Sequence, residues 1–506
     1  MDSHRPSSLS YGGEEAVRPV AVPSGLTPPD RSSLSVLCGT DNDLWDLVRA
    51  VVARQPGSVR LSHRAHQSAT SLPANLPFSA PILPVCCARA EGAHLYDVDG
   101  NDYVDCHLSY TAAVLGHNPP PVVAAVRDRI ATGVGAAYFC PEQVELTELL
   151  TETVPGADRA GLFHTGADTV AAAARMARAS TGRQVVAKFQ GSYHGSHEIG
   201  LYNSLGPAGP RDPASGYELR PGGNGLRALT GDDLLVLPFD DQAALGLVAE
   251  HAADLACVVV DPVPRFRGQA PHAAREFLRA LRAVTAEHDV PLVVDEVITG
   301  FRMAPGGAQE AFGVTADITC LGKLTSGLGV PLSAVTGRAD HLDRARSDGL
   351  PGDASKTWLS STHQANHLAV VAALAQLRHL RDHHGEIFDR IDGLHDLLRA
   401  RLDEFAHRSG IPVHLRGHPR HVTLLALGEP LDDRASYEEW AEEMGSPAMV
   451  RAMQMLSLHL RLRGVYTLGA PTMNLSAAHT EADIDQITSA VADSLLVMAR
   501  QNLLPT

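Results

Sequence analysis

The stretch PLVVDEVITGFR, Pro291 to Arg302, places two carboxylates directly after an apolar run. Leu292–Val294 is typical of a buried strand in a parallel sheet, because such strands read as continuous apolar segments. A carboxylate at the end of such a strand must be paired or hydrogen-bonded, since an isolated buried charge is very unfavourable. Asp295 is therefore predicted to meet a cation at the edge of a sheet.

Further short apolar runs indicate the rest of that sheet. They alternate with segments of helical spacing, most clearly at 273–289. Strand–helix alternation of this kind predicts an α/β fold, with a mostly parallel central sheet flanked by helices. The predicted strands are 183–189, 255–262, 290–296, 317–322 and 331–337.

Changes of composition and of apolar spacing along the chain predict four segments. Residues 1–60 are expected to form a disordered tail, rich in Ser, Pro and Gly, with a short helix at 42–55. Residues 61–110 form an N-terminal segment that joins the small domain, with a hairpin at 94–105. Residues 111–370 form the large α/β domain. Residues 371–506 form a smaller C-terminal α+β domain, whose last helix begins at a capping box of Thr480 and Asp483.

Composition limits the classes of partner. The 506-residue chain carries a net charge of −16 with no basic cluster, which argues against nucleic-acid binding. Its seven cysteines include no C-x-x-C pair and predict free thiols in a reducing compartment. No signal-peptide h-region and no long apolar run occur, so we expect a cytoplasmic protein without membrane contact. His379 and His383 lie one helical turn apart but lack a metal-binding motif, and we assign no metal.

Lysine is rare in this chain, where only Lys188, Lys323 and Lys356 occur. Lys323 follows the predicted strand 317–322 and enters a glycine-rich loop. Partial desolvation at a strand end would favour the neutral, nucleophilic amine. An ordinary surface lysine on a glycine-rich loop is the alternative, and this stretch alone leaves it open. The glycine spacing fits neither a Walker loop nor a dinucleotide fingerprint.

Two more features follow apolar runs. Thr165 and Gly166 open an Ala-rich helix, whose exposed N–H groups and positive end could hold a phosphate. Tyr193 lies between Gly191 and Gly195, which let the backbone turn sharply and present the ring to a ligand. A simple helix start and an ordinary loop are the alternatives.

All four features fall at strand ends, where α/β sheets bind their ligands. A phosphate cradle, a flat aromatic face, a buried carboxylate and a reactive lysine together suit a planar phosphorylated cofactor that forms an imine. We predict pyridoxal 5′-phosphate (PLP), whose pyridinium nitrogen would be the cation that Asp295 meets.

The segment DEVITGFR, followed by FGVTADITCLGKLTSGLGVPLSAVTGR, closely resembles the class III (ω-type) aminotransferases of PLP fold type I. The motifs LYDVDGNDYVDCHLSYTAAVLGHNPPPVVAAV, GSYHGSHE and LSAAHTEADID match the same family in the same order. The nearest branch is that of glutamate-1-semialdehyde 2,1-aminomutase, and the resemblance runs from about residue 82 to 500.

The resemblance implies roles for four side chains around the cofactor ring. Lys323 would carry the cofactor and then transfer protons. Asp295 would keep the ring nitrogen protonated. Val297 would pack on one face of the ring and Tyr193 on the other.

The resemblance also implies how the phosphate is held. The family's cradle falls on Thr165, Gly166 and Ala167, and Ala167 replaces a hydroxyl residue, which leaves more of the task to backbone N–H groups. The segment SSTHQANHL matches one that lends a Thr, here Thr362, to the phosphate of a neighbouring subunit, which implies a homodimer. The aminomutase holds the substrate carboxylate with an Arg in a segment that matches 73–79, where this chain has none.

We therefore predict a PLP-dependent aminotransferase that moves an amino group between an amine donor and an aldehyde or ketone, in specialised metabolism such as that of amino sugars. The runner-up is an aminomutase of the glutamate-1-semialdehyde type, or an epimerase, in which the nitrogen returns to the same molecule. The third hypothesis, a catalytically inactive homologue, conflicts with the retention of Asp295 and Lys323. Without the missing Arg we expect no isomerisation of glutamate-1-semialdehyde, unless another arginine such as Arg302 substitutes.

Overall fold

The computed structural model describes residues 42–59, 61, 85–135, 138–204, 206, 208–264, 271–346, 355–432, 435–467 and 471–505. The chain divides into two compact units. Unit 1 comprises Met1–Arg89 and Leu95–Asp102, and unit 2 comprises Ala90–His94 and Tyr103–Thr506. Asp295 and Lys323 therefore both belong to unit 2.

Unit 1 contains helix α2 (Asn42–Arg54), which confirms the helix predicted at 42–55. The residues after α2 are tied to a turn, because Asp99 accepts hydrogen bonds from Gly57 N at 2.6 Å and from Ser58 N at 2.9 Å. Asn101 Nδ2 donates to the carbonyl of Arg54 at 3.0 Å. The other positions of the predicted disordered tail, 1–41 and 60, lie outside the described residues.

The turn predicted for the hairpin at 94–105 is confirmed. Strands β2 (His94–Asp97) and β3 (Asp102–Asp105) flank it, and β1 (Cys87–Glu91) precedes them. Asp97 N donates to the carbonyl of Asn101 at 3.0 Å. Gly100 has φ +84°, in the left-handed region that favours glycine.

Unit 2 is built on a seven-stranded central sheet of order β4-β12-β11-β10-β9-β5-β8. Strand β12 runs antiparallel to both of its neighbours, and the other neighbouring pairs are parallel. The predicted mostly parallel sheet is confirmed, and β4 and β8 are added to the five predicted strands. The strands are β4 (Arg159–Phe163), β5 (Val185–Phe189), β8 (Leu234–Leu237), β9 (Leu255–Val260), β10 (Leu292–Glu296), β11 (Ile318–Leu321) and β12 (Ser333–Gly337).

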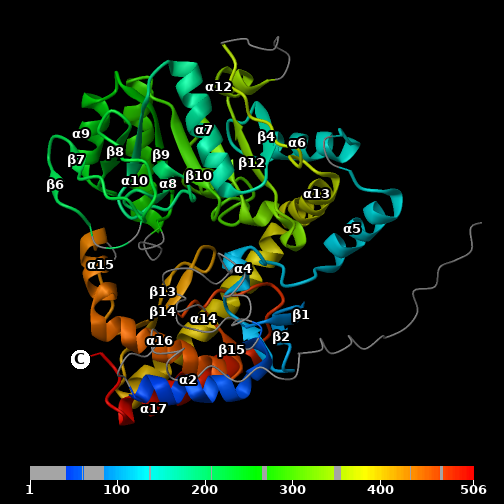
Figure 1. Ribbon diagram of the computed structural model, residues 1–506, viewed down its shortest axis with the longest axis vertical. Coiled ribbons are helices and arrows are strands. Elements are labelled where there is room, and N and C mark those ends of the chain that lie inside the picture. The colour runs from blue at the N-terminus through cyan, green and yellow to red at the C-terminus, as the bar shows by residue number, and fades with distance from the viewer. Residues whose placement is uncertain are drawn as a thin grey trace, which may run out of the picture. The chain divides into compact units, whose positions relative to one another are not determined.

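Helices cover both faces of this sheet (Figure 1). On one face, α7 (Gly166–Thr181) packs its buried alanines against a layer that includes Val293. On the other face, α10 (Pro271–Glu287), predicted at 273–289, packs against a layer that includes Leu292 and Val294. Successive residues of β10 thus enter two different apolar layers, which explains why the strand reads as one continuous apolar run.

Further helices, 3-10 turns and two very short strands complete the sheet region. The helices are α4 (Leu108–Thr111), α5 (Pro120–Thr132), α6 (Pro141–Thr153), α8 (Glu198–Leu201), α9 (Gln242–Glu250), α11 (Gly307–Phe312) and α12 (Ala339–Leu342). The 3-10 turns are η2 (Lys323–Thr325), η3 (Gly327–Gly329) and η4 (Asp343–Ala345). The two-residue strands β6 (Arg211–Asp212) and β7 (Gly216–Tyr217) form an antiparallel pair.

The C-terminal part of the chain changes to longer helices and short strands, as predicted. The last helix begins at a capping box of Thr480 and Asp483, which confirms its predicted start. The predicted boundary between positions 370 and 371 falls within α13 and stays a prediction. The elements are α13 (His367–Asp382), α14 (His384–Ser409), β13 (Val413–Gly417), β14 (Thr423–Leu427), α15 (Tyr437–Gly445), α16 (Pro447–Leu462), β15 (Val465–Tyr466) and α17 (Glu481–Arg500).

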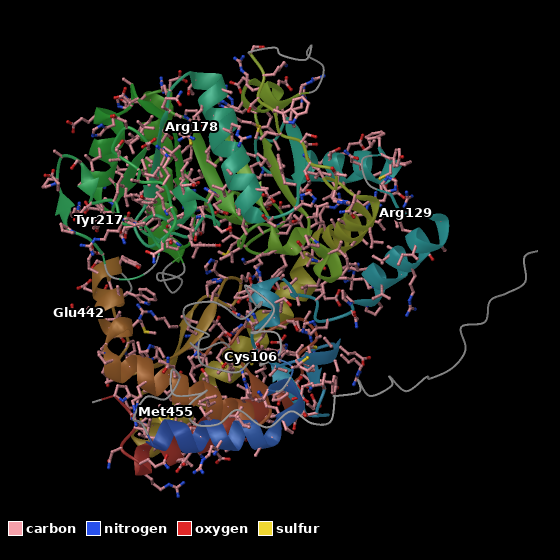
Figure 2. All side chains as sticks on the ribbon, viewed as in Figure 1. Cys106, Arg129, Arg178, Tyr217, Glu442 and Met455 are labelled. Carbon is pink, nitrogen blue, oxygen red and sulfur yellow. The ribbon has the colours of Figure 1, made fainter. Side chains whose placement is uncertain are left out.

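Helix α15 joins this C-terminal part to the sheet region, near the labelled Tyr217 (Figure 2). The hydroxyl of Tyr217 donates to Glu438, in the first turn of α15. The hydroxyl of Tyr437 donates to the carbonyl of Gly206 at 2.7 Å, and its ring joins the apolar layer that contains α10. The two parts of unit 2 are thus connected by specific polar contacts as well as by packing.

The described residues contain neither a membrane-spanning helix nor a metal-binding cluster. Among them, no helix is long and apolar enough to cross a membrane. In the same part of the chain, no group of three or more His, Cys, Asp or Glu is arranged to hold a metal ion. The cysteines that the structure describes are all free thiols.

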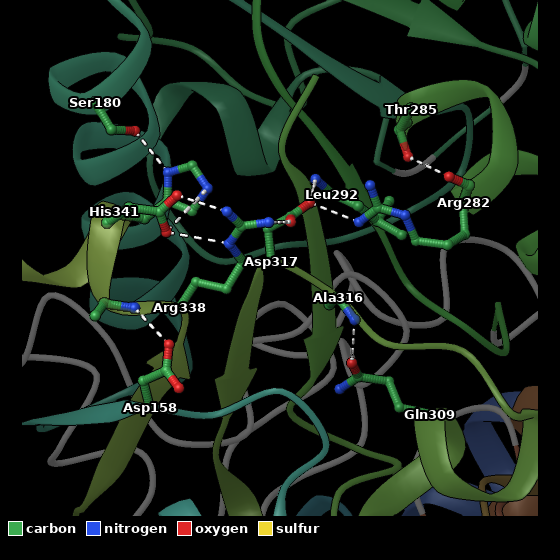
Figure 3. A network of polar contacts seen from close by, with 12 residues as sticks. Asp158, Ser180, Arg282, Thr285, Leu292, Gln309, Ala316, Asp317, Arg338 and His341 are labelled. Atoms are coloured by element: carbon green, nitrogen blue, oxygen red, sulfur yellow. Dashed lines mark hydrogen bonds and ion pairs between the residues drawn. The ribbon is translucent and has the colours of Figure 1, made fainter. Parts of the chain in front are cut away.

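Asp317 ties several elements together at the amino ends of the strands (Figure 3). Its Oδ2 accepts from Arg282 Nη1 at 2.6 Å and from Leu292 N at 2.8 Å, and its Oδ1 lies 3.5 Å from Arg338 Nη1. These partners come from α10, the start of β10 and the residue after β12. The carboxylate is only 10% exposed, so its loss would leave the buried amide of Leu292 and the 22% exposed Arg282 without this acceptor.

Asp317→Ala is therefore expected to lower the free energy of unfolding by about 3 kcal/mol, as for other broken buried pairs. Asp340→Ala is a matched control, because Asp340 also pairs with Arg338, at 2.7 Å, but its side chain is 54% exposed. The control is expected to lose less than about 1 kcal/mol. Urea unfolding followed by circular dichroism measures both changes, and equal losses would contradict the argument from burial.

Candidate active site

Strands β10 and β11 bring Asp295 and Lys323 to one edge of the central sheet. The two strands are parallel neighbours, with Asp295 opposite Cys320 and Glu296 opposite Leu321. Lys323 follows shortly after β11 ends at Leu321. The strand-end positions predicted for both residues are confirmed, while their catalytic roles stay predictions.

Asp295 is held by two hydrogen bonds and is 8% exposed. Its Oδ1 accepts from the backbone N of Val297 at 3.1 Å. Its Oδ2 lies 2.7 Å from Nδ1 of His194, whose side chain is fully buried. The predicted aromatic loop after β5 therefore reaches Asp295 through His194, across the intervening strand β9.

Asp295 also acts on a buried lysine. Lys188, in the middle of β5, is fully buried, and burial lowers its pKa to about 7, although the negative charge of Asp295 opposes this shift. Its Nζ donates to the carbonyls of Ser192, Gly200 and Tyr202. A fully buried amine that three carbonyls hold is a poor candidate for covalent attachment of a cofactor.

The turn that presents Lys323 is firmly held. Lys323 is half-buried and has φ +48°, a left-handed conformation that is unfavourable for a residue with a Cβ. Thr325 Oγ1 donates to the carbonyl of Leu332 at 2.5 Å, and Ser326 Oγ to the same carbonyl at 2.9 Å. Backbone strain that surrounding bonds maintain in this way is common in functional sites.

A second strained turn lies near Lys323. Four consecutive residues without glycine, Leu108–Thr111, have positive φ values between 51° and 74°. His107 precedes this turn and packs edge-on against Tyr110, with ring centroids 4.1 Å apart. Burial lowers the pKa of His107 to about 4, and the positive charge of Lys323 adds to the effect. A neutral imidazole therefore adjoins the candidate lysine, and no sequence pattern had indicated it.

Helix α7 presents free amides at its N-terminus. Thr165 caps the helix in a capping box, because Asp168 N donates to Thr165 Oγ1 and Thr165 N donates to Asp168 Oδ2. The amides of Gly166 and Ala167 have no acceptor among the described residues. Two free N–H groups at the positive end of a helix suit a phosphate.

Three glycines bring the cradle, the lysine loop and the aromatic loop together. A Cβ added to Gly166 would lie 2.9 Å from a methyl of Val297, and one added to Gly322 would lie 3.1 Å from the other methyl. A Cβ on Gly195 would lie 2.6 Å from Cβ of Ala167. An added Cβ would be too close at Gly166 and Gly195 and tight at Gly322, so each glycine permits a close approach. Val297 therefore lies between the start of α7 and the loop of Lys323.

Gly195→Ala is expected to weaken PLP binding at least about tenfold, because the added methyl would push the aromatic loop away from the phosphate cradle. Gly182→Ala is the matched control, since Gly182 also has a positive φ of 73° but has nothing within 4 Å of its added Cβ. Both variants carry backbone strain, and only the first changes the site. Titration of the apoprotein with PLP, followed by absorption, measures the difference.

Three further residues were considered for the site from the sequence: Tyr193, Thr362 and Arg302. Tyr193 is 42% exposed, so its ring is accessible. Thr362 is exposed in a turn before α13, and no bond connects it to Lys323 or Asp295. Arg302, which was considered as a substrate-binding cation, is 1% exposed and donates to the carbonyl of Thr111. Arg302 therefore supports the strained turn and is not accessible to a substrate carboxylate.

The comparisons with known proteins agree with this geometry. The profile of the family "Aminotransferase class-III" matches residues 77–423. A curated relative, glutamate-1-semialdehyde 2,1-aminomutase of Thermomicrobium roseum, is 34% identical over 462 residues, which cover 90% of this chain and 98% of the relative.

Two solved structures extend the likeness to three dimensions. An omega-transaminase from Sphaerobacter thermophilus has a TM-score of 0.78 and 30% identity, over 88% of this chain and 99% of that chain. A transaminase solved with PLP bound has a TM-score of 0.71 and 25% identity, over 88% of this chain and 99% of that chain.

Proposed function

The chain belongs to the class-III aminotransferase family, whose members have PLP fold type I and depend on PLP, and from this premise we propose that Lys323 carries the cofactor in an amino-group migration. The observation that supports the proposal is the position of Asp295 and Lys323 at adjacent strand ends. The free amides of Gly166 and Ala167 lie on the other side of Val297.

The residues at this edge fit PLP. The amides of Gly166 and Ala167 would hold the phosphate, and Thr165 would position them by capping the helix with Asp168. Gly166 and Gly322 pack closely against the two methyls of Val297, which fixes this side chain so that it could pack on one face of a planar ring. Tyr193, on the loop that packs against Ala167, would cover the opposite face of the ring.

When bound, PLP supplies an electron-accepting ring that stabilises the carbanion left after a substrate loses a proton. Asp295 would hold the proton on the ring nitrogen, since its carboxylate is buried and fixed by His194 and the amide of Val297. Lys323 would take the proton from one carbon of the substrate and return it to another. A general acid–base of this kind contributes roughly 10²- to 10⁴-fold to the rate.

We propose an aminomutase as the first candidate reaction, in which the nitrogen returns to the same molecule. Its support is the 34% identity to a glutamate-1-semialdehyde 2,1-aminomutase over 90% of this chain. An aminotransferase specialised for amino sugars has no such support. The contrary expectation rested on the missing Arg at 73–79, positions that lie outside the described residues.

The second candidate is transfer between two molecules, an amine donor and a carbonyl acceptor. The likeness to an omega-transaminase favours it. The burial of Arg302 favours it as well, because a mutase substrate with a carboxylate needs an accessible cation.

One assay separates the two candidates. The purified protein is given glutamate-1-semialdehyde alone, and the aminomutase proposal expects 5-aminolevulinate at about 1 per second or faster. Lys356→Ala protein serves as an active control, since Lys356 Nζ donates to the carbonyl of Asp343 away from the site. No product with this substrate, combined with release of a keto product once an amine and an acceptor aldehyde are added, would replace the mutase with the transaminase.

We further propose a homodimer in which Thr362 contributes to the phosphate site of the partner. The exposure of Thr362 and the resemblance of its segment support this arrangement. Inactive Lys323→Ala and Thr362→Ala proteins, mixed under conditions that exchange subunits, are expected to recover activity, because one site of each mixed dimer then lacks both changes. Ser361→Ala replaces Thr362→Ala in the control mixture. Mixed dimers that stay inactive would contradict the shared site.

A further inference from the structure

Lys188 is a buried cation that the proposed reaction does not use. It lies in β5, whose residues are all buried, and its side chain is among the largest that are fully buried. Its Nζ donates to the carbonyls of Ser192 at 2.7 Å, Gly200 at 3.3 Å and Tyr202 at 2.7 Å. No described carboxylate forms an ion pair with it.

These three carbonyls belong to one loop, residues 190–204, which follows β5, includes the short helix α8 and carries Tyr193 and His194. Gly191 N donates to the carbonyl of Asn203 at 2.8 Å, which closes the loop at its base. The three N–H groups of the ammonium thus meet three backbone carbonyls of this loop. A protonated lysine is the side chain whose donors match this set, because an ammonium has three N–H groups and no acceptor.

The loop connects Lys188 to Asp295 through His194. The Nδ1 atom of His194 lies 2.7 Å from Oδ2 of Asp295, and His194 N donates to the carbonyl of Gly200 at 3.4 Å. Gly200 thus accepts from both Lys188 and His194. The charge of Asp295 also acts on Lys188 directly. The buried cation is therefore linked to the carboxylate through the loop that carries His194.

We propose that Lys188 is a positioning residue. Its three hydrogen bonds fix the loop that carries Tyr193 and His194, and through His194 they hold the carboxylate of Asp295 in place. The inference rests on the proposed function, in which Asp295 meets the ring nitrogen of PLP. The organisation of the loop around Lys188 is a property of the protein itself and can be measured without the cofactor.

Two substitutions separate the charge of Lys188 from its hydrogen bonds. Lys188→Met keeps the length and removes both, whereas Lys188→Gln keeps two N–H donors and removes the charge. Lys356→Met is the matched control, because Lys356 Nζ also donates to a backbone carbonyl, that of Asp343 at 2.9 Å. The readouts are hydrogen exchange of residues 190–204 in the apoprotein, PLP affinity, and the pH titration of the visible absorption of the bound cofactor.

Lys188→Met is expected to raise the exchange rate of the loop amides at least tenfold and to weaken PLP binding by roughly 10- to 100-fold, the range seen when outer partners of metal ligands are removed. Both variants are expected to shift the pH titration of the absorption band, since the loosened loop no longer holds His194 firmly against Asp295. Lys356→Met is expected to change none of these. Folded Lys188→Met protein with normal exchange and a normal titration would overturn the proposal.

Lysine NMR keeps the proposal testable if neither variant folds. Because the chain has only three lysines, selective labelling yields three side-chain signals, and Lys323→Ala and Lys356→Met assign that of Lys188 by elimination. Asp295→Asn is expected to shift the Lys188 signal and to leave that of Lys356 in place. No shift would sink the proposal. Wild-type protein that binds no PLP would refute the proposed function instead, while the exchange and NMR measurements would still decide the role of Lys188.

Discussion

Lys323→Ala protein is expected to lose at least about 10⁴-fold in turnover, because one side chain would supply both the covalent attachment and the proton transfer. Its fold should be little changed, since Thr325 and Ser326 hold the turn through the carbonyl of Leu332. Alanine at this position would have the same φ of +48° as the lysine, so the substitution adds no new backbone strain. Steady-state kinetics and circular dichroism measure the two effects.

The attachment itself can be mapped. Borohydride reduction of the wild-type holoenzyme, followed by proteolysis and mass spectrometry, is expected to mark Lys323. Lys356→Ala protein should be marked at the same position and remain active. A label on Lys356 would move the active site. A label on Lys188 would contradict the three hydrogen bonds that fix its amine inside the loop.

The strands that build the site could be predicted because they are buried on both faces. Continuous apolar runs such as Leu292–Val294 are readable as strands without knowledge of their neighbours. Their directions are not readable in this way. Strand β12 has the same kind of apolar sequence as the parallel strands of the sheet, but it is antiparallel to both of its neighbours, β11 and β4. Only the path of the connecting loop determines this direction.

Some site residues could be placed from the sequence as readily as the strands, and others could not. Asp295 and Lys323 follow apolar runs and could be placed from sequence alone. The bond between His194 and Asp295 could not, because it depends on a loop whose sequence has no periodicity. The turn at Leu108–Thr111 was hidden for a related reason: it has positive φ throughout but contains none of the glycines that usually indicate such a conformation.

Asp295→Asn is expected to keep the fold and the bound cofactor but to lose about 10²- to 10³-fold in turnover. The amide oxygen can still accept from Val297 N, and the phosphate cradle is unchanged. A neutral amide cannot hold a proton on the ring nitrogen, so the carbanion loses its electron sink. Glu296→Gln is the matched control, because burial raises the pKa of this neighbouring carboxyl and its charge has no role in the proposed reaction.

The cause of that loss can be tested apart from its size. A PLP analogue methylated on the ring nitrogen carries a fixed positive charge and needs no carboxylate to keep it. Reconstituting Asp295→Asn apoprotein with this analogue is expected to recover part of the turnover, whereas Lys323→Ala apoprotein should recover none. If the analogue gives no recovery although it binds, Asp295 acts by orienting the ring and not through its charge. Lys188 would keep its role in that case, because it holds the loop of His194 and hence the orientation of Asp295.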